Sequence, residues 1–598
     1  MRFPSLDTLW IAARGSFVRF PGVMLCAVTG AVAAIVAVEV DDPEDWVKLF
    51  LCAQLGIPFM FAITLAGEAR GWSAARVWAL RALALLALVG YGLTFQEKYE
   101  VVSGTRHAQY TIGALLLVAF LPFRIQEQPG GFWQYNRSLF TRMCVAVLYS
   151  AVLCGGLELA LVGIDELLGV NVPDELYFHL FATIAMVVMP WVFAGGVPRD
   201  IPALDTDTEY PRGLKVFAQY ILLPIVIIYL AILMIYLGKI VVTRVWPSGW
   251  IGWMVSIVAV VGIFANLLVH PVRDREGNQW VRTYARWYYI IMVPAAVMLL
   301  LAVGKRIDQY GITENRYILA VLGTWLAGLC VYFILRSSRN IKVIPITLCI
   351  IAFATSFGPW GAFSVSHSSQ LGRLAGLLER NGILVEGVLV PAPGDVPLED
   401  RREISAITHY IVTTHGVDRI RPWFGERWAQ VDSAGAVTGG EGKAEQTAVV
   451  RVVKAMGITY VERWRTSGNA ENSNYVLAPE AQVFPLEAAD VMVRAGWGSY
   501  GLELEGPSRT ISWNDAKGGF DIVVGGDTLR VDMQGWLEER RGELGDGYGT
   551  LSADMARVVA QDDRVRAVAY VQSVHCSIRE GEPTITNIQV QCYLTWLD

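Results

Sequence analysis

The sequence predicts an α-helical polytopic membrane bundle followed by a soluble α+β C-terminal domain. Between Pro21 and Trp360, about eleven apolar runs are long enough to cross a bilayer, and no such run follows Trp360. A helix needs about 20 apolar residues to span the hydrocarbon core. The chain is also 54% hydrophobic and only 17% charged, against about 25% charged residues in a typical soluble domain. We therefore expect a transmembrane domain over residues 1–360 and a soluble domain over residues 361–598.

The predicted spans are apolar runs, and Trp and Tyr cluster at the ends of several of them. The first, Val23 to Val40, is longer than the apolar core of a signal peptide and is followed by acidic residues, so we interpret it as a retained span. The fourth is the weakest, because it is short and begins with polar residues. In order, the predicted spans are residues 22–40, 48–66, 77–95, 108–122, 140–162, 176–197, 216–242, 250–270, 287–303, 317–334 and 342–360.

The distribution of basic residues predicts the orientation. With a cytoplasmic N-terminus, the loops and span ends on that side carry 18 Lys and Arg residues, and those on the other side carry eight. Cytoplasmic loops normally carry this excess. An odd number of spans places the C-terminal domain on the opposite side, which in a bacterium is the periplasm. We therefore expect a multi-pass protein of the bacterial inner membrane, with a cytoplasmic N-terminus and a periplasmic C-terminal domain.

Helices are predicted first in the C-terminal domain, and strands later. The segment HSSQLGRLAGLLERNG places leucines on one helical face and ends at Gly382, which suits a C-terminal cap. A second amphipathic helix is predicted over Leu398 to His415. FDIVVGGDTLRVDM has the Gly-Gly turn and alternation of a hairpin. A short helix in GWLEERRGELGDGYG and a final strand pair, VRAVAYVQSVHCSIR with TITNIQVQCYLTWL, complete the prediction.

Cysteines leave one question open in that last strand pair. Six of the eight lie in predicted spans, and only Cys576 and Cys592 lie in the C-terminal domain, one in each strand. Their separation of 16 residues lets both point to one face, and a disulfide would suit an oxidising periplasm. A turn centred near Glu582 would instead pair Cys576 with about residue 588. Two free buried thiols are therefore the alternative.

The sequence excludes several common function classes. It contains no Walker A loop, GxSxG elbow, HExxH helix or CxxC pair. The seven histidines are scattered singly, so we expect no metal site and no cofactor. From Gly361 onward, 22 basic and 32 acidic residues give a net charge of −10, which argues against nucleic acid as a partner. Standard hydrolase, kinase or metallopeptidase chemistry is not indicated.

Ionisable residues inside predicted spans are candidates for function, because burying them in lipid is costly. Glu158 and His179 lie near the outer ends of adjacent antiparallel spans, so we expect them at equal depth as an intramembrane polar pair or proton relay. The alternative is a contact that only pairs the two helices. Arg81 lies about one turn from the inner end of its span and can extend to the headgroups.

Two polar segments near the outer ends of the last three spans form the second candidate site. These are RIDQYGITENRY and FGPWGAFSVSHSSQ, which we expect to meet in one polar patch. Basic side chains beside hydroxyls suit a phosphate or another anion. The alternative is that the arginines form salt bridges with Asp308 and Glu314. The candidate residues for binding an anion or lipid headgroup are Lys305, Arg306, Arg316, Ser366 and His367.

The same segments carry a family resemblance. RIDQYGITENRY, RSSRNIKVIP, FGPWGAFSVSHSSQLGRL and ISAITHYIVTTHGVDRIRPWFG follow one another in this order. In this the chain resembles a bacterial polytopic membrane family known only as domain of unknown function four-one-five-three. The resemblance covers roughly Arg306 to Gly425, while the first half is similar in hydropathy alone. It implies a bacterial inner membrane protein and brings no activity, cofactor or catalytic residue.

Three classes of function remain. The leading hypothesis is a protein without recognisable enzymatic chemistry that binds a periplasmic partner, acts as a scaffold, or gates a path through the bundle. A membrane-embedded transferase acting on a lipid-linked substrate is the runner-up, with Asp308, Glu314 or His367 as its general base. An ion-coupled transporter using Glu158 and His179 is the third. The expected partners are the lipid bilayer and either a periplasmic protein or a lipid headgroup.

Overall fold

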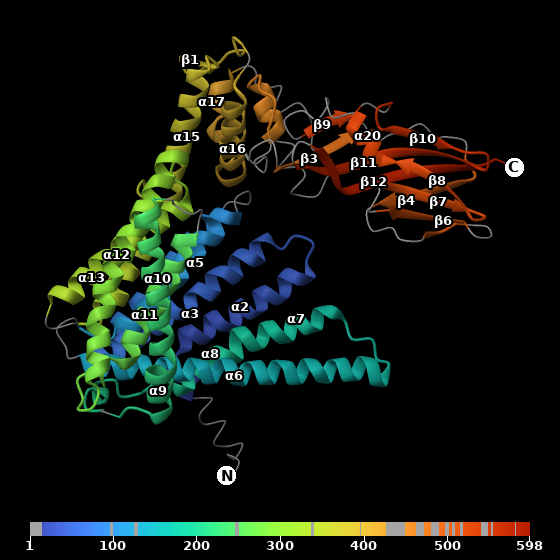
Figure 1. Cartoon of the computed structure of the whole chain (residues 1–598). Coiled ribbons are helices and arrows are strands. Elements are labelled where there is room, and N and C mark those ends of the chain that lie inside the picture. Colours follow the sequence, from blue (N-terminus) through green and yellow to red (C-terminus); the bar gives the residue numbers. More distant parts are fainter. Residues whose placement is uncertain are drawn as a thin grey trace. The chain divides into compact units, whose positions relative to one another are not determined.

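A computed structural model provides the fold (Figure 1). The chain forms two compact units, residues 1–394 with 407–456 and residues 395–406 with 457–598, and each is described by itself. The structure describes residues 15–597 except for 96–99, 125–128, 208, 245–249, 337–339, 395, 426–427, 429–448, 462–471, 480–488, 497–501, 505–508, 515–517, 540–547, 552–553 and 580–581.

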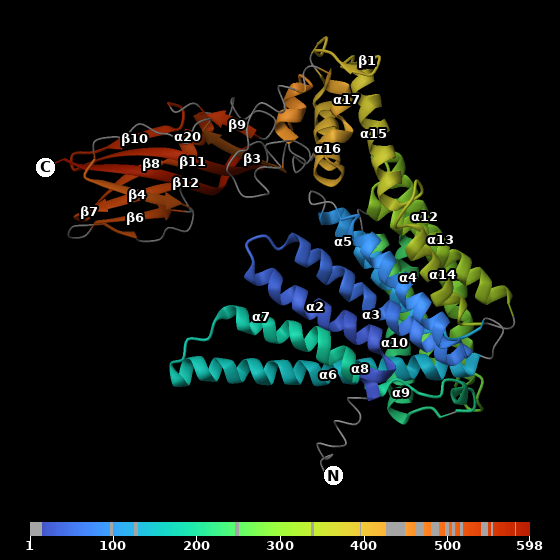
Figure 2. The ribbon, with the colours of Figure 1, turned by 180° about the vertical axis from the view of Figure 1, so that it is seen from behind.

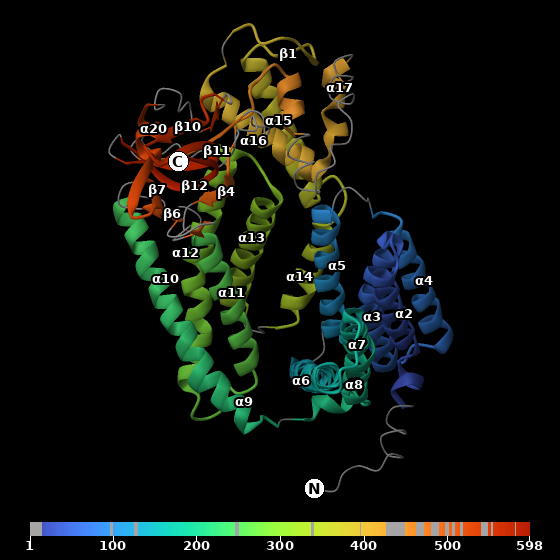
Figure 3. The ribbon, with the colours of Figure 1, turned by 90° about the vertical axis from the view of Figure 1, so that its right-hand side faces the viewer.

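The first unit is a bundle of long apolar helices. Within the described residues, nine helices or continuous helical segments are long and apolar enough to cross a membrane, which confirms the predicted class. They are α2 (Pro21–Glu39), α3 (Glu44–Arg70), α4 (Ala74–Gly92), α6 (Pro129–Leu168), α7 to α8 (Asp174–Gly196), α9 to α10 (Arg212–Thr243), α11 (Trp250–Val269), α12 (Gln279–Tyr310) and α13 (Glu314–Leu335). Figure 3 shows α10 to α13 side by side, in agreement with their mutual contacts.

Two of the eleven predicted spans are helices that are too polar or too short to count as membrane-spanning. One is α5 (Glu100–Phe120), which is long enough but polar in its first half, and the other is α14 (Val343–Ala354). The 12 residues of α14 rise only about 18 Å. The two helices pack together: the Cys349 thiol lies 3.4 Å from the Gly113 carbonyl, and Gln109 donates to Thr355 at 3.1 Å. Figure 2 shows α5 beside α3, which it also contacts.

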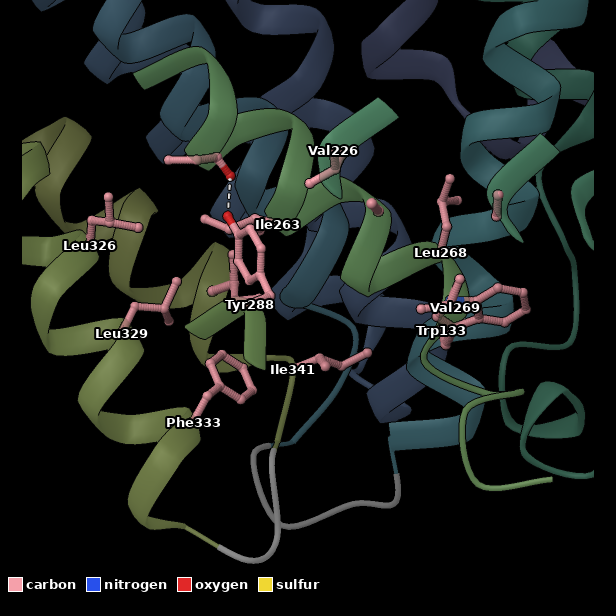
Figure 4. Close-up of a cluster of buried hydrophobic side chains, with 14 of the residues drawn as sticks. Trp133, Val226, Ile263, Leu268, Val269, Tyr288, Leu326, Leu329, Phe333 and Ile341 are labelled. Carbon is pink, nitrogen blue, oxygen red and sulfur yellow. Dashed lines mark hydrogen bonds between the residues drawn. The ribbon is translucent and has the colours of Figure 1, made fainter. Parts of the chain in front are cut away.

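Small residues and rings build the core of the bundle, as is common where helices pack without a hydrophobic driving force. The Tyr288 hydroxyl donates a hydrogen bond to the Ala259 carbonyl at 3.0 Å (Figure 4). Its ring lies against Gly262, where a Cβ would be only 2.1 Å from ring carbon Cε2. Beside it, Tyr289 stacks on Phe333 with ring centroids 4.6 Å apart. This packing joins α11, α12 and α13.

The first unit extends beyond the last apolar run. After α14 the chain turns at Gly358, which has a φ of +78°, and enters α15 (Ala362–Arg380). This helix begins five residues before the predicted start, and Gly382 follows it with a φ of +67°. A short hairpin follows, and then α16 over Leu398–His415, the predicted range, of which residues 407–415 belong to the first unit. The hairpin and the short helix after α16 are β1 (Leu384–Val385), β2 (Val388–Leu389) and α17 (Arg421–Phe424).

The second unit consists mainly of antiparallel strands in two sheets. One sheet has the order β4-β12-β11-β3-β9, with β10 also paired to β11, and the other has the order β5-β6-β7-β8. Buried residues of both sheets form one core, together with α20 (Met533–Glu539). The strands are β3 (Asn472–Pro479), β4 (Val491–Gly496), β5 (Leu502–Glu503), β6 (Arg509–Asn514), β7 (Gly519–Val524), β8 (Asp527–Asp532), β9 (Tyr548–Leu551), β10 (Arg557–Gln561), β11 (Val565–Arg579) and β12 (Glu582–Trp596).

Both predicted strand pairs are confirmed, but the disulfide is not formed. Gly525 and Gly526 turn β7 into β8 with φ values of +60° and +99°. In the pair of β11 with β12, Cys576 lies opposite Ile585, whereas Cys592 lies opposite Ala569. Both cysteines are buried and free. The register of the hairpin therefore keeps the thiols apart, which is the alternative that the turn position predicted.

Candidate functional site

A buried carboxylate at the turn between α12 and α13 is the centre of the candidate site. Gly311 ends α12 with a φ of +71°, a conformation that favours glycine, and α13 begins three residues later at Glu314. An acidic residue in the first turn suits the positive end of the helix dipole. The Glu314 side chain is only 14% exposed. The negative charge of Glu314 must therefore be stabilised by neighbouring hydrogen-bond donors.

Three side chains from two other helices supply those donors. The hydroxyls of Ser366 on α15 and Tyr410 on α16 both donate to Glu314 Oε1. His415, the last residue of α16, places Nε2 3.5 Å from the same oxygen and 3.4 Å from the Tyr410 hydroxyl. Ser366 is fully buried, and the His415 side chain is 8% exposed. We call Glu314, Ser366, Tyr410 and His415 the Glu314 network.

Further hydrogen bonds hold α15 against the α12–α13 turn. Gln370 donates to the carbonyls of Tyr310 and Ile312, at 3.0 Å each. The Ile312 amide donates to Ser369 Oγ at 3.0 Å. Tyr317 on α13 donates to the Trp360 carbonyl at 2.5 Å. These bonds confirm that the segments RIDQYGITENRY and FGPWGAFSVSHSSQ meet, as the sequence predicted.

A second histidine lies beside the network. The rings of His367 and His415 are 5.0 Å apart, and His367 Nε2 is buried without a hydrogen-bond partner. Burial lowers the pKa of His367 below its usual value, and the nearby His415 and Arg419 lower this pKa further. Burial raises the pKa of Tyr410, and so does its hydrogen bond to Glu314. At neutral pH the site therefore contains a neutral His367 and a protonated Tyr410.

The predicted anion-binding residues divide into two groups. Ser366 and His367 lie in or beside the Glu314 network. Arg316 instead donates to the carbonyls of Tyr310 and Gly311, at 3.1 and 2.7 Å. It thus binds carbonyls at the end of α12, a contact that was not predicted from the sequence. Lys305 and Arg306 lie on exposed positions of α12.

The predicted intramembrane pair has different partners in the structure. His179 places Nε2 3.0 Å from Glu39 Oε1 on α2. Glu158 accepts a hydrogen bond from the Cys154 thiol one turn earlier in its own helix, at 3.1 Å. The structure thus pairs His179 with Glu39 rather than with Glu158. Equal depth on antiparallel helices does not decide which faces meet, and α2 also packs against α7.

Sequence reasoning missed several polar contacts of the first unit. Tyr410 and His415 lie in the predicted helix 398–415, but its apolar spacing does not show that its polar face meets α13. A second missed group is Gln54, Tyr91 and His107, in which the His107 ring contacts Gln54 Oε1 at 2.8 Å and the Tyr91 hydroxyl at 3.3 Å. Within the described residues, no group of three or more His, Cys, Asp or Glu side chains is arranged to hold a metal ion.

Chemically, the Glu314 network combines a carboxylate, a phenol, an imidazole and a hydroxyl in a buried setting. Such groups can hold helices together through charge-assisted hydrogen bonds, which are about twice as strong as neutral ones. They can also exchange protons, because each titrates or donates. Three segments of the chain that lie far apart in sequence, around residues 314, 366 and 410, meet at this one oxygen.

Comparisons with known proteins identify a family without an established activity. The chain is 22% identical over 284 residues to the uncharacterized protein PM1469 of Pasteurella multocida (strain Pm70), a match that covers 46% of this chain and 47% of the relative. The chain thus spans about half the length of that relative. No solved structure matches. Residues 24–381, which include every described transmembrane helix from α3 to α13 and nearly all of α2, match the family described as "Domain of unknown function (DUF4153)". The chain belongs to this family.

Proposed function

We propose that this protein acts in the bacterial cell envelope as a membrane scaffold or gate, in which the Glu314 network fastens the start of the C-terminal region to the membrane helices. The proposal places the protein in the inner membrane, with a cytoplasmic N-terminus and the strand-rich unit in the periplasm. The excess of Lys and Arg in alternate loops supports this orientation. The strand-rich unit would then be free to bind a periplasmic partner.

One observation carries the proposal: Glu314, the first residue of the last long span, accepts hydrogen bonds from both helices that follow the membrane helices. α15 and α16 lead from the bundle to the second unit. A buried carboxylate that loses its donors pays a large desolvation cost. The network therefore favours one arrangement of α15 and α16 on α13, as a scaffold or the resting state of a gate requires.

Hydrogen exchange tests the fastening role. In the purified full-length protein, Glu314→Gln should speed amide exchange in α15 and α16 by about ten-fold or more, because the charge that strengthens the hydrogen bonds is lost. Asp308→Asn removes one carboxylate from an exposed position of α12 and should leave this exchange unchanged. Equal exchange in Glu314→Gln and in the unaltered protein would reject the fastening role.

Reporter fusions test the orientation separately. Alkaline phosphatase fused after Asp598 should be active, since it folds only in the periplasm, and the same enzyme fused after Arg199 should be inactive. The opposite result would place the strand-rich unit in the cytoplasm. The scaffold would then act on cytoplasmic partners, and the Glu314 network would be unaffected.

The buried, unpartnered Nε2 of His367 favours a second candidate, a transferase acting on a lipid-linked substrate. His415 lies between His367 and Glu314, an order in which a carboxylate orients one imidazole next to a second base. His367→Gln should then change the profile of polar lipids in cells that express it, while hydrogen exchange in α15 stays normal. An unchanged lipid profile would remove this candidate.

A further inference from the structure

The turn between α3 and α4 gathers three arginines. Arg70 is the last residue of α3, Arg76 lies in the first turn of α4, and Arg81 lies two turns into it. No carboxylate of the described chain forms an ion pair with any of the three. Glu68 acts on Arg81 electrostatically, but both its oxygens are bound by Arg19, at 2.9 and 2.7 Å.

Two tryptophans hold these guanidinium groups. The Trp72 ring has Arg76 at 4.4 Å and Arg70 at 5.8 Å from its centroid. The Trp78 ring has Arg81 at 4.8 Å. Because tryptophan prefers the headgroup level of a bilayer, the indoles set the depth of the three charges. In a bilayer we therefore expect the guanidinium groups near the level of the lipid phosphates.

The burial of Arg81 favours an anionic partner for these arginines. Arg81 is only 7% exposed, and one of its nitrogens donates to Thr64 Oγ1 at 3.0 Å. Its Nε is buried without a hydrogen-bond partner, and so is Nε of Arg70. A buried guanidinium with an unused donor and no carboxylate is costly. A negatively charged group beside the α3–α4 turn would offset part of this cost by its attraction to the guanidinium groups.

We propose that the arginines of the α3–α4 turn bind the phosphate of an anionic phospholipid. Phosphate accepts several N–H bonds from guanidinium groups in a planar geometry. Basic sites between transmembrane helices commonly hold anionic headgroups. The apolar surface of α4 beyond Arg81 is open to acyl chains, since Leu83, Leu86 and Val89 are 61%, 69% and 63% exposed. This surface favours a lipid over free phosphate as the occupant. The site is separate from the Glu314 network.

Native mass spectrometry of the full-length protein tests this site. The protein, freed of lipid in detergent, is titrated with phosphatidylglycerol, with phosphatidylcholine and with inorganic phosphate. The test variant is Arg70→Gln with Arg76→Gln. The matched control is Arg212→Gln with Lys215→Gln, which removes the same charge from exposed positions of α9. Arg81→Lys, which keeps the charge but not the fork of donors, serves as a third variant.

Phosphatidylglycerol should bind the unaltered protein at least ten-fold more tightly than phosphatidylcholine. The test variant should lose on the order of ten-fold or more of this affinity, since each basic residue near the surface adds to anionic lipid binding, and Arg81→Lys should lose several-fold. The control should keep it. Equal losses in test and control variants would overturn the proposal, as would equal binding of the two lipids. Displacement of phosphatidylglycerol by equimolar inorganic phosphate would also overturn it, in favour of a phosphate site.

Discussion

Replacing Tyr410 by phenylalanine removes one donor to Glu314 and leaves the ring in place. A hydrogen bond to a charged group contributes about 1.5–3 kcal/mol. Since Glu314 keeps Ser366 as a donor and His415 as a neighbour, we expect a loss near the middle of that range, about 2 kcal/mol. This free energy corresponds to an increase of about 30-fold in the equilibrium constant for opening. The contact between α16 and α13 should therefore open far more often.

Hydrogen exchange of the purified protein, followed in peptides from α15 and α16, measures this opening. Tyr220→Phe is the matched control, because the Tyr220 side chain is 67% exposed on the helix that leads into α10. Its exchange should match that of the unaltered protein. If Tyr410→Phe changed exchange no more than Tyr220→Phe does, the carboxylate would not depend on this donor. The Glu314 network would then not fasten α16 to α13.

Three further predictions concern pH, packing and the cysteines. Folding lowers the pKa of His367, so as the pH falls the imidazole is protonated in the unfolded chain before it is protonated in the folded protein. The stability of the folded protein should therefore fall as pH drops below about 6.5. The difference between Tm at pH 7.5 and Tm at pH 5.5 should be smaller in His367→Gln than in the unaltered protein. Gly262→Ala should cost about 1–3 kcal/mol through overpacking against Tyr288, seen as a lower Tm, whereas Gly238→Ala, which meets open space, should not lower it. Alkylation of the unfolded protein without reductant should modify both Cys576 and Cys592, and protection of the pair would contradict the register.

The membrane class and most elements were predictable because long apolar runs and strand alternation are properties of single segments. Helix 398–415 and the pair β11 with β12 are examples. The start of α15 was missed because its first turn, Ala362 to Val365, lacks a polar cap and contains no leucine. Gly361 stands at the N-cap position. The weakness of the fourth predicted span had a physical cause, since α5 carries the polar residues His107 and Gln109 that contact α3 and α14.

The candidate site was only partly predictable, because side-chain partners depend on which helix faces meet. The proximity of the two polar segments followed from consecutive helices joined by short turns. The spacing of residues could not show that Tyr410 contacts these two segments, because 96 residues separate Tyr410 from Glu314. The error with His179 has the same origin: α2 and α6 both offer a carboxylate, at Glu39 and Glu158, and only the packing of α7 decides between them.

The short turn at Gly311 couples the adjoining ends of α12 and α13 mechanically. Only three residues join the two helices, and Gln370 and Arg316 bind the carbonyls of that turn. A displacement of α15 would therefore act on α12 and α13 at the end where they are joined. α13 has 22 residues and is about 33 Å long, so a small tilt at Glu314 would be carried across the hydrocarbon core to the stacked rings of Tyr289 and Phe333. A force on α15 outside the bilayer would thus move residues at the opposite side of the bilayer.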